Sequence, residues 1–405
     1  MADAPATPPR SSFARYWGAA AVSSFGTAVT AVAMPVLVVQ VLEATPLQIG
    51  IVNAAQFVPY AVLGLFAGVY VDRWRRKPIL VWAGIGRALA LGSIVALWLA
   101  DALQIWILVV ALLLFGAFSV MGFAATQSLL PHLVPRHRLV VANARLDQTD
   151  AAAQTLGPTL GGGLVGLLGA PLTIMVDAVS YLVDAALIAG IRVEEERTNR
   201  PRRLWGEVGE GLRWTYRHRT LGPLAMSTHV WFLGNSAALT VLSILALRTL
   251  EFSPFAYGLL FAVLGLTSLI GATAAPRVGD AIGAGRAIIL ARSTYPLVWI
   301  LVAAAPSTGF PDVLIFVALG VQGLAAGVEN ANEMGYWQAT TPDGLLGRTN
   351  AVRRSANRTL AAVGALLAGL LVGLVGAGPV LLGVVALLVT AAAVVWLSPL
   401  RYANR

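Results

Sequence analysis

Residues 157–170, Gly-Pro-Thr-Leu-Gly-Gly-Gly-Leu-Val-Gly-Leu-Leu-Gly-Ala, return in altered form at residues 364–377 as Gly-Ala-Leu-Leu-Ala-Gly-Leu-Leu-Val-Gly-Leu-Val-Gly-Ala. The two stretches lie 207 residues apart, and further pairs of identical residues share this offset. These pairs are Pro135 with Pro342, Leu139 with Leu346, Asn143 with Asn350, Ala144 with Ala351 and Gly64 with Gly271. Self-similarity in one register over so many positions indicates that the chain contains two copies of one unit.

The amino-acid composition places both copies in a membrane. Of the 405 residues, 58% are hydrophobic and 12% are charged, about half the charged share of a soluble domain. This excludes a soluble globular enzyme, because no core packed in water needs so much apolar surface. The chain has no cysteine, which excludes disulfides, thiolate metal sites and cysteine nucleophiles. The net charge of +9 could suggest nucleic acid, but the charges form short clusters between apolar runs and indicate membrane topology instead.

Apolar stretches of about 20 residues, separated by proline, glycine and charged residues, predict the membrane-spanning helices. We expect these helices near residues 16–42, 47–71, 78–100, 104–130, 141–169, 172–191, 221–247, 254–276, 286–305, 312–337, 350–376 and 379–398. The prediction is an all-α membrane protein of twelve transmembrane helices, in two six-helix bundles related by the repeat. The first apolar run is long enough to span, and no cleavage-like site ends it, so we expect a helix there and not a signal peptide.

A hydrophilic segment between the two groups of helices defines the domain boundaries. We expect an N-terminal bundle over residues 1–192, a linker over 193–220 and a C-terminal bundle over 221–405. The second part of the linker, Leu204 to Arg219, spaces its apolar residues like an amphipathic helix. We expect that helix to lie on the inner membrane surface.

The charges between the helices divide by the end of the bundle on which they fall. One end carries Glu43, Asp101, Asp312 and little else. The basic residues of the other end are Arg10, Arg15, Arg73, Arg75, Arg76, Lys77, Arg136, Arg138, Arg277, Arg286, Arg348, Arg401 and Arg405. By the positive-inside rule this end and both termini are cytoplasmic. Arg248 is the exception, and a local ion pair with Glu251 would explain it.

Six spans per copy give the two copies the same orientation in the membrane. Parallel halves related by an axis along the membrane normal are typical of secondary transporters with a site near the bilayer midplane. The sequence therefore predicts a transporter that works by alternating access, with a small molecule as substrate.

The loop after the second predicted helix reads Gly68-Val-Tyr-Val-Asp72-Arg73-Trp-Arg75-Arg76-Lys77. It is similar to the Gly-x-x-x-Asp-Arg-x-Gly-Arg-Arg/Lys signature of the major facilitator superfamily, with Arg75 in place of the second glycine. The chain resembles that superfamily over essentially its whole length, and the resemblance implies that Asp72 caps and pairs with the start of the eleventh helix to hold the halves together on the cytoplasmic side. The arginines expected there are Arg348, Arg353 and Arg354. The alternative is a solvated basic loop that only sets topology.

The fifth predicted helix contains Gly157-Pro158-Thr-Leu-Gly161-Gly162, which looks like the Gly-Pro-x-x-Gly-Gly core of exporters in this superfamily. Proline kinks a helix and glycine lets a neighbouring helix approach closely, which suits a joint between moving halves. The alternative is ordinary packing of small residues. The tract from Leu133 to Ala144, together with the tract from Val176 to Tyr181, looks most like the branch of bacterial drug and macrolide efflux proteins and siderophore exporters. This resemblance implies a multi-pass protein of the bacterial cytoplasmic (inner) membrane.

Two residues depart from the proton-coupled members of the superfamily. The fourth predicted helix lacks the arginine that many of them carry, and Thr27 stands where the related branch often has an acid. The groups that would carry protons must therefore be sought elsewhere in the chain.

Ionisable side chains at membrane depth cost about 3 kcal/mol or more and are functional candidates by default. The candidates are Arg87, Asp177, Asp184, His229, Glu329 and Glu333. Arg87 and Asp184 both lie about 12–14 Å from the cytoplasmic ends of their helices, so we expect a structural ion pair. Asp177 is expected to be a structural hydrogen-bonding acid or a proton relay. His229 is expected to be a satisfied polar residue or a group that titrates near neutral pH.

Glu329 and Glu333 share one face of the tenth predicted helix because they are spaced i, i+4. Two carboxylates on one face in a low dielectric repel, which raises the pKa of at least one of them. Glu329 is the first choice for proton coupling. For Glu333 an alternative stays open, in which it pairs with Arg348 or Arg353 and helps to close the inner gate.

Amide and aromatic side chains on the remaining cavity-lining helices are candidates for substrate contact. They are Asn53, Gln56, Phe123, Gln127, Trp231, Asn235, Thr240, Tyr336 and Trp337. Aromatic walls with scattered amides suit a large amphipathic ligand that needs few directional contacts.

The function predicted from these features is proton-driven export, by antiport, of an amphipathic drug, antibiotic or natural product. An importer or symporter of a sugar, peptide or lipid on the same fold is the alternative. A membrane-embedded enzyme is disfavoured, because the sequence offers no metal cluster and no nucleophile with a base. We expect a monomer in the lipid bilayer, without a cofactor and without a metal.

Overall fold

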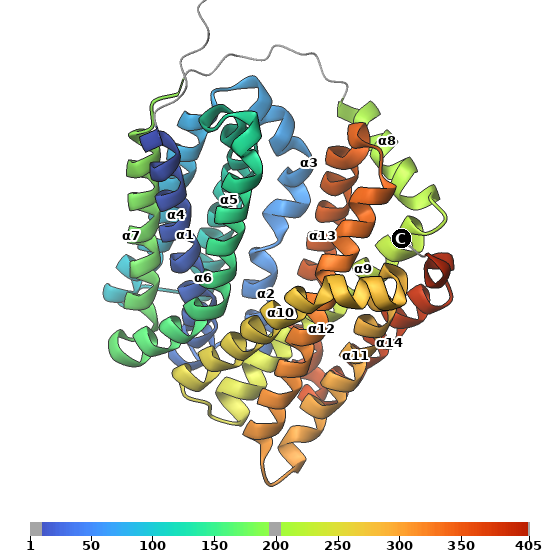
Figure 1. Ribbon diagram of the computed structural model, residues 1–405. Helices are drawn as coiled ribbons and strands as arrows, with labels where there is room; N and C mark the ends of the chain where they lie inside the picture. Colours follow the sequence, from blue (N-terminus) through green and yellow to red (C-terminus); the bar gives the residue numbers. More distant parts are fainter. Residues whose placement is uncertain (1–9, 194–203, 404–405) are drawn as a thin grey trace, which may run out of the picture.

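The computed structural model describes residues 10–193 and 204–403, and all of the regular elements in that part are helical. For some residues inside these helices, only the backbone is described. The chain forms two helical halves that stand side by side (Figure 1).

The N-terminal half contains six membrane-length passes. Its helices are α1 (Arg10–Val36) with the π-helical turn η1 (Leu37–Val41), α2 (Pro46–Ala55), α3 (Val58–Arg73), α4 (Arg76–Leu99), α5 (Ile105–Leu133), α6 (Leu139–Leu168) and α7 (Ala170–Ala189). The second predicted helix is thus two helices, α2 and α3. The division falls at Gln56 and Phe57, two residues before Pro59, which has no backbone N–H to donate and lies in the first turn of α3.

The C-terminal half repeats this order. Its helices are α9 (Leu221–Ile244) with the π-helical turn η3 (Leu245–Thr249), α10 (Pro254–Ile282), α11 (Ala284–Ala304), α12 (Pro311–Thr340), α13 (Asp343–Val375) and α14 (Ala377–Trp396). Eleven of the described helical segments are long and apolar enough to cross a membrane. The glycine-rich α6 is not among them, although its 30 residues pack within the bundle beside α1 and α10. The predicted fold class, two six-helix bundles of one repeated unit, is confirmed.

The predicted amphipathic helix is α8 (Leu204–Arg217), and it packs on the C-terminal half (Figure 1). It contacts α13 and α9. A Cβ added at Gly211 would lie 3.0 Å from the carbonyl oxygen of Arg348 on α13, so the two backbones are close. Arg348 also forms ion pairs with Glu207, at 3.8 Å, and with Glu210. The first part of the predicted linker, residues 194–203, lies outside the described residues.

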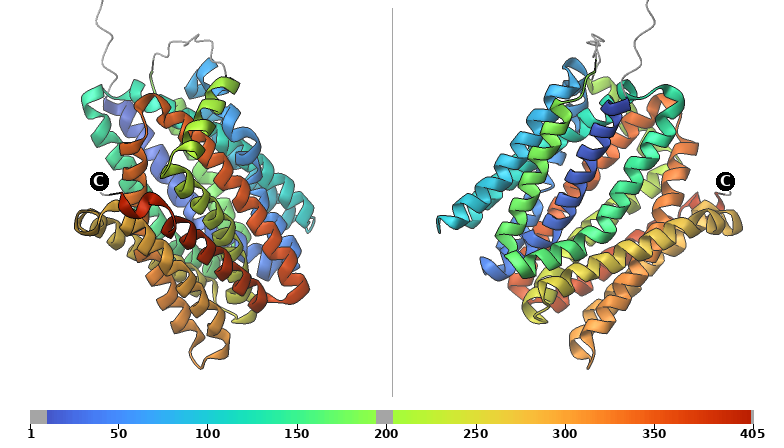
Figure 2. Two further views of the ribbon diagram at one scale, coloured as in Figure 1. Left: turned by 90° about the vertical axis from the view of Figure 1, so that its right-hand side faces the viewer. Right: turned by 60° about the vertical axis from the view of Figure 1, so that its left-hand side comes forward.

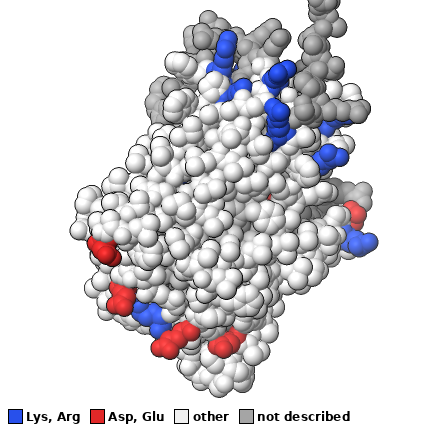
Figure 3. Space-filling model, turned by 90° about the vertical axis from the view of Figure 1, so that its left-hand side faces the viewer, with Lys and Arg blue, Asp and Glu red and all other residues white. Residues whose placement is uncertain are grey.

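The two ends of the molecule differ in charge. Lysine and arginine gather at one end of the face drawn in Figure 3, and aspartate and glutamate lie mostly at the other. We call the end with loops 74–75 and 134–138 the basic end, and the end with loops 42–45 and 100–104 the acidic end. The separation follows the alternation that the sequence predicts.

Close contact between the halves is concentrated toward the acidic end. A Cβ added at Gly258 of α10 would clash with the carbonyl oxygen of Pro158 on α6. On the other side of the interface, a Cβ at Gly50 of α2 would lie 2.7 Å from the carbonyl oxygen of Ala365 on α13. Larger residues would force these helices apart. From this crossing α10 runs obliquely away from the N-terminal half toward the far side of the C-terminal half (Figures 1 and 2).

The glycines of the predicted exporter motif serve this packing. Gly157 and Gly161 lie against α1, where added Cβ atoms would meet Ala28 and the backbone of Val29. Gly162 lies against Pro254 and the start of α10 in the other half. One face of α6 therefore packs against its own half, and the adjoining face packs against the other half.

Reciprocal hydrogen bonds join the segments around the two π-helical turns at the acidic end. Gln40 Nε2 donates to the carbonyl oxygen of Leu247 at 3.3 Å, and Arg248 donates to those of Val39 at 3.5 Å and Ala44 at 2.7 Å. Gln40 and Arg248 are 208 residues apart, as are the acceptors Val39 and Leu247. We call this contact the Gln40–Arg248 clasp.

The clasp corrects the sequence-based explanation of Arg248. No ion pair forms between Arg248 and Glu251 among the described residues. Arg248 lies at the acidic end because it bonds to main-chain carbonyls of the other half.

The orientation in the membrane can be tested with single cysteines, because the chain has none of its own. Ser307 is exposed at the acidic end, and Gly344 at the basic end has open space for a Cβ. We expect Ser307→Cys to react with a membrane-impermeant maleimide in intact cells, and Gly344→Cys to react only after permeabilisation. The reverse pattern of labelling would place the basic end outside the cell.

Candidate functional site

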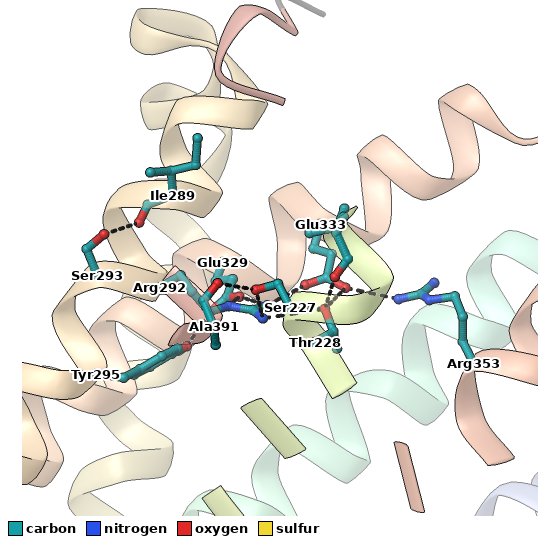
Figure 4. Close-up of polar contacts among 11 residues, drawn as sticks. Ser227, Thr228, Ile289, Arg292, Ser293, Tyr295, Glu329, Glu333, Arg353 and Ala391 are labelled. Atoms are coloured by element: carbon teal, nitrogen blue, oxygen red, sulfur yellow. Dashed lines mark hydrogen bonds and ion pairs between the residues drawn. The ribbon is translucent and has the colours of Figure 1, made fainter. Parts of the chain in front are cut away.

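The largest buried polar cluster described lies inside the C-terminal half (Figure 4). We call it the Arg292 cluster. Its members are Arg292 and Tyr295 of α11, Glu329 and Glu333 of α12, Ser227 and Thr228 of α9, and Arg353 of α13. Four helices of one half therefore meet at these side chains.

Arg292 is the centre of the cluster and is 2% exposed. Its Nε donates to Glu329 Oε1 at 2.5 Å, and its Nη2 donates to Glu333 Oε2 at 3.0 Å. Its Nη1 donates to Ser227 Oγ at 3.0 Å. Glu329 also accepts a hydrogen bond from Tyr295 Oη at 2.5 Å. The guanidinium and the Glu329 carboxylate are thus both satisfied inside the protein, as buried charges must be.

Glu333 links the cluster to the helix that faces the other half. Its Oε1 accepts hydrogen bonds from Arg353 Nη2 at 3.0 Å and from Thr228 Oγ1 at 3.2 Å. Arg353 in turn stacks on the buried Trp337, with its Cζ 3.7 Å from the ring centroid. With all four groups ionised, Arg292 and Arg353 balance the two glutamates.

The environment of the i, i+4 glutamate pair, Glu329 and Glu333, differs from the one that the sequence predicts. The sequence predicts two carboxylates that repel each other on a face lining the central cavity. In the structure an arginine lies between them, and Glu329 points toward α11 within its own half. Glu333 pairs with Arg353, as in the alternative kept open for it, whereas Arg348 pairs with α8.

Sequence reasoning missed Arg292, although the signal was present. It is the only charged residue in the stretch from 287 to 311. A lone arginine within an apolar run is a functional candidate by the same argument that selected Arg87.

His229 lies beside the cluster and has hydrogen-bond partners on both ring nitrogens. Its Nδ1 is 2.6 Å from Asn357 Oδ1 on α13, and its Nε2 is 2.7 Å from Tyr216 Oη on α8. Burial raises the pKa of Tyr216, so the phenol stays protonated and can donate to the imidazole. His229 therefore connects α8 to the interior of the C-terminal half.

The N-terminal half has its own buried charges. Arg87 Nη2 on α4 lies 3.2 Å from Asp184 Oδ2 on α7, and the guanidinium stacks on Tyr181 at 4.2 Å. Asp177, on the same helix, is 0% exposed. Ser180 donates to its Oδ1 at 3.0 Å, while its Oδ2 has no hydrogen-bond partner in the described part of the chain.

The signature loop at the basic end is described only in part. Arg76 is buried and Lys77 Nζ donates to the carbonyl oxygen of Ile191 at 2.8 Å. The expected clamp depends on the side chains of Asp72 and Arg73, which lie outside the described set, as do the surroundings of Gly68.

Some of the predicted substrate-contacting residues lie at the interface between the halves, and others lie inside the C-terminal half. Asn53 Nδ2 donates to Thr240 Oγ1 at 3.2 Å across the interface between the halves. Phe123 also faces the other half, with its ring centroid 3.9 Å from the guanidinium carbon of Arg354. Gln56 lies at the α2–α3 break, and the Gln127 side chain lies outside the described set.

Four of these candidates instead lie within the C-terminal half. Trp231 packs beside Tyr295 of the Arg292 cluster, and Trp337 is 2% exposed under Arg353. Tyr336 donates to Thr220 at 2.8 Å. Asn235 accepts a bond from Gln322 at 3.4 Å. In this conformation the Tyr336 and Trp337 side chains are both held by their own half, and their contact with substrate stays a prediction.

No group of three or more His, Cys, Asp or Glu side chains that could hold a metal ion occurs among the described residues. The acidic groups of the Arg292 cluster pair with arginines instead.

Comparison with known proteins adds the family context. Residues 4–405 match the family described as transmembrane secretion effector. The multidrug efflux pump Tap of Mycobacterium tuberculosis (strain H37Rv) is 29% identical over 219 residues, which cover 51% of each chain. The MFS-type transporter YfiS of Bacillus subtilis is 28% identical over 41% of this chain and 39% of its own length. The chain thus spans about half the length, or less, of these curated relatives.

Solved structures of similar fold cover nearly the whole chain. The nucleoside transporter NupG gives a TM-score of 0.75 at 11% identity over 95% of this chain and 98% of its own. A bacterial homologue of the iron transporter ferroportin in the inward-facing state gives 0.73 at 16% identity over 95% and 97%. These likenesses concern the fold alone.

Proposed function

Because this chain belongs to the transmembrane secretion effector family of major facilitator transporters, and is thus a multi-pass membrane transporter and not an enzyme, we propose that it exports amphipathic small molecules in exchange for protons. The export works by alternating access, in which the two halves rock about their contacts and open to one side at a time. The relative named a multidrug efflux pump supports the direction of transport and the substrate class.

The observation that carries this proposal is the unequal closure of the interface between the halves. At the acidic end the backbones of α6 and α10 touch and the Gln40–Arg248 clasp joins the two π-helical turns. Toward the basic end Arg354 and the 40% exposed Phe123 face each other and stay accessible. An interface packed more closely at one end than at the other is what an alternating-access transporter needs.

The positive-inside rule places the basic end in the cytoplasm. Under this proposal both termini are cytoplasmic, the membrane is the bacterial inner membrane, and the less closely packed end of the interface faces the compartment from which the substrate is taken.

The Arg292 cluster is the proposed proton-coupling element. Its two arginines and two glutamates cancel in charge, so a proton on either glutamate would leave the buried cluster with one uncompensated positive charge. Such a charge is costly, and the cost is relieved only if an arginine moves. A movement of Arg353 would shift α13, and α13 would transmit the shift to the other half because it packs on α2 and α3.

Asp177 is a second candidate for carrying the proton. It is fully buried, and one of its carboxylate oxygens lacks a donor among the described groups. An added proton would let that oxygen act as a donor without creating an unpaired charge.

The proposal is tested by transport into inverted membrane vesicles. We expect uptake of an amphipathic fluorescent dye when a pH gradient, acid inside, is imposed. Vesicles without the protein, and vesicles whose gradient has been collapsed with a proton ionophore, should accumulate no dye. Equal uptake with and without the gradient would argue for another coupling ion or for facilitated exchange.

A further inference from the structure

Two arginines of α13 face the N-terminal half from one side of the helix. Arg354 and Arg358 are spaced i, i+4 and therefore share a face. The Arg354 Cζ lies 3.9 Å from the ring centroid of Phe123 on α5. The Arg358 Cζ lies 5.5 Å from the ring centroids of both Phe57 and Tyr60, at the start of α3. The two cations and three aromatic rings thus form one surface between the halves.

Neither arginine has a carboxylate partner among the described residues. The other arginines at membrane depth do, since Arg87 pairs with Asp184 and Arg292 pairs with Glu329. Even Arg353, the immediate neighbour of Arg354, pairs with Glu333 at 3.0 Å. Arg354 and Arg358 therefore place two like charges one helical turn apart, an unfavourable arrangement that an anion would relieve.

This surface is accessible in the present conformation. Arg354 is exposed although it is the twelfth residue of a 33-residue helix, and Phe123 is 40% exposed. Arg354 and Phe123 contact each other across the interface, and both side chains keep part of their surface exposed at that level. Nearer the acidic end, in contrast, Ala365 on the same helix is fully buried against Gly50.

We propose that Arg354 and Arg358 bind the anionic group of the transported molecule, while Phe57, Tyr60 and Phe123 hold its aromatic or apolar part. A planar guanidinium binds a carboxylate, sulfonate or phosphate through two parallel hydrogen bonds. The substrates are then anionic amphipathic molecules, and lipophilic cations are rejected by the two arginines. This inference rests on the proposed function, because it names the substrate class of the same transporter.

Equilibrium binding to the purified protein in detergent tests the inference without any ion gradient. Carboxyfluorescein serves as the anionic aromatic probe and ethidium as the cationic one, each followed by fluorescence anisotropy. We expect carboxyfluorescein to bind at least tenfold more tightly than ethidium. Arg354→Gln and Arg358→Gln should each weaken carboxyfluorescein binding about tenfold, the loss of one charge-assisted contact. Arg358→Lys should lose less, because it keeps the charge.

The matched control is Arg286→Gln, which removes one exposed positive charge from α11, a helix that packs mainly on α12 and α14 of the C-terminal half. It should bind carboxyfluorescein like the wild type, and all variants should keep the wild-type thermal midpoint. Equal affinity for the two probes, or unchanged binding in the Arg354→Gln/Arg358→Gln double variant, would overturn the inference.

Binding and transport together separate this inference from the proposed function. If the double variant loses transport but keeps carboxyfluorescein binding, the two arginines serve a gate and the inference is wrong. If binding behaves as expected while vesicle transport ignores the pH gradient, the inference stands and the proton-coupled mechanism falls.

Discussion

Arg292→Gln should destabilise the protein by about 3–5 kcal/mol, the usual effect of removing one partner from a buried ion pair. Without the guanidinium, Glu329 keeps only the hydrogen bond from Tyr295, while Glu333 keeps Arg353 and Thr228. The buried negative charge on Glu329 is then uncompensated. The measurement is the thermal midpoint and the unfolding free energy of the purified protein in detergent.

A charge-balanced variant separates this effect from simple loss of packing. Arg292→Gln combined with Glu329→Gln removes one positive and one negative charge and should recover most of the lost stability. Arg286→Gln, at an exposed position, should leave stability unchanged. If the double variant is less stable than Arg292→Gln alone, electrostatic pairing is not what holds the cluster together.

Glu329→Gln should abolish transport against a gradient while sparing substrate binding. The amide is neutral in every state, so a proton can no longer bind and leave at this position. Downhill exchange of substrate should survive, because it needs the halves to rock but needs no net proton movement. The measurement is pH-gradient-driven uptake into inverted vesicles, beside counterflow of labelled substrate in the same vesicles.

Glu333→Gln is the informative companion to this variant. If Glu333 mainly holds Arg353 near α9, its loss should reduce the rate of transport but keep the dependence on the pH gradient. If the two glutamates titrate as one unit, both variants should uncouple transport equally. Full gradient-driven uptake in Glu329→Gln would contradict its assignment and leave Asp177 as the acid to examine.

Much of the fold could be predicted from the sequence because its signals are long and repeated. The 207-residue offset and the apolar runs each involve many residues, so single errors do not alter the conclusion. Equal depth from the basic end was enough to predict the pairing of Arg87 with Asp184. Depth along a helix is readable because every residue adds a fixed rise of 1.5 Å.

Features that depend on helix rotation could not be predicted in the same way. The sequence places Glu329 on a cavity-lining helix, but such a helix has other faces too, and the face that carries Glu329 meets Arg292. Arg248 has Glu251 as a near neighbour in sequence, which favours a local ion pair. Its partner carbonyls belong to the other half, and nothing local in the sequence shows them.

The Gln40–Arg248 clasp has a consequence for the history of the chain. Gln40 and Arg248 hold equivalent positions in the two repeats, and each donates to the equivalent carbonyl oxygen of the other repeat. Such reciprocal contact is what an isologous dimer of two identical subunits shows. The geometry implies an ancestor of six spans that met a second copy of itself across a two-fold axis. One residue position then made both bonds. In the present chain the two positions differ, so that glutamine and arginine share a task that a single amino acid would do in two identical copies.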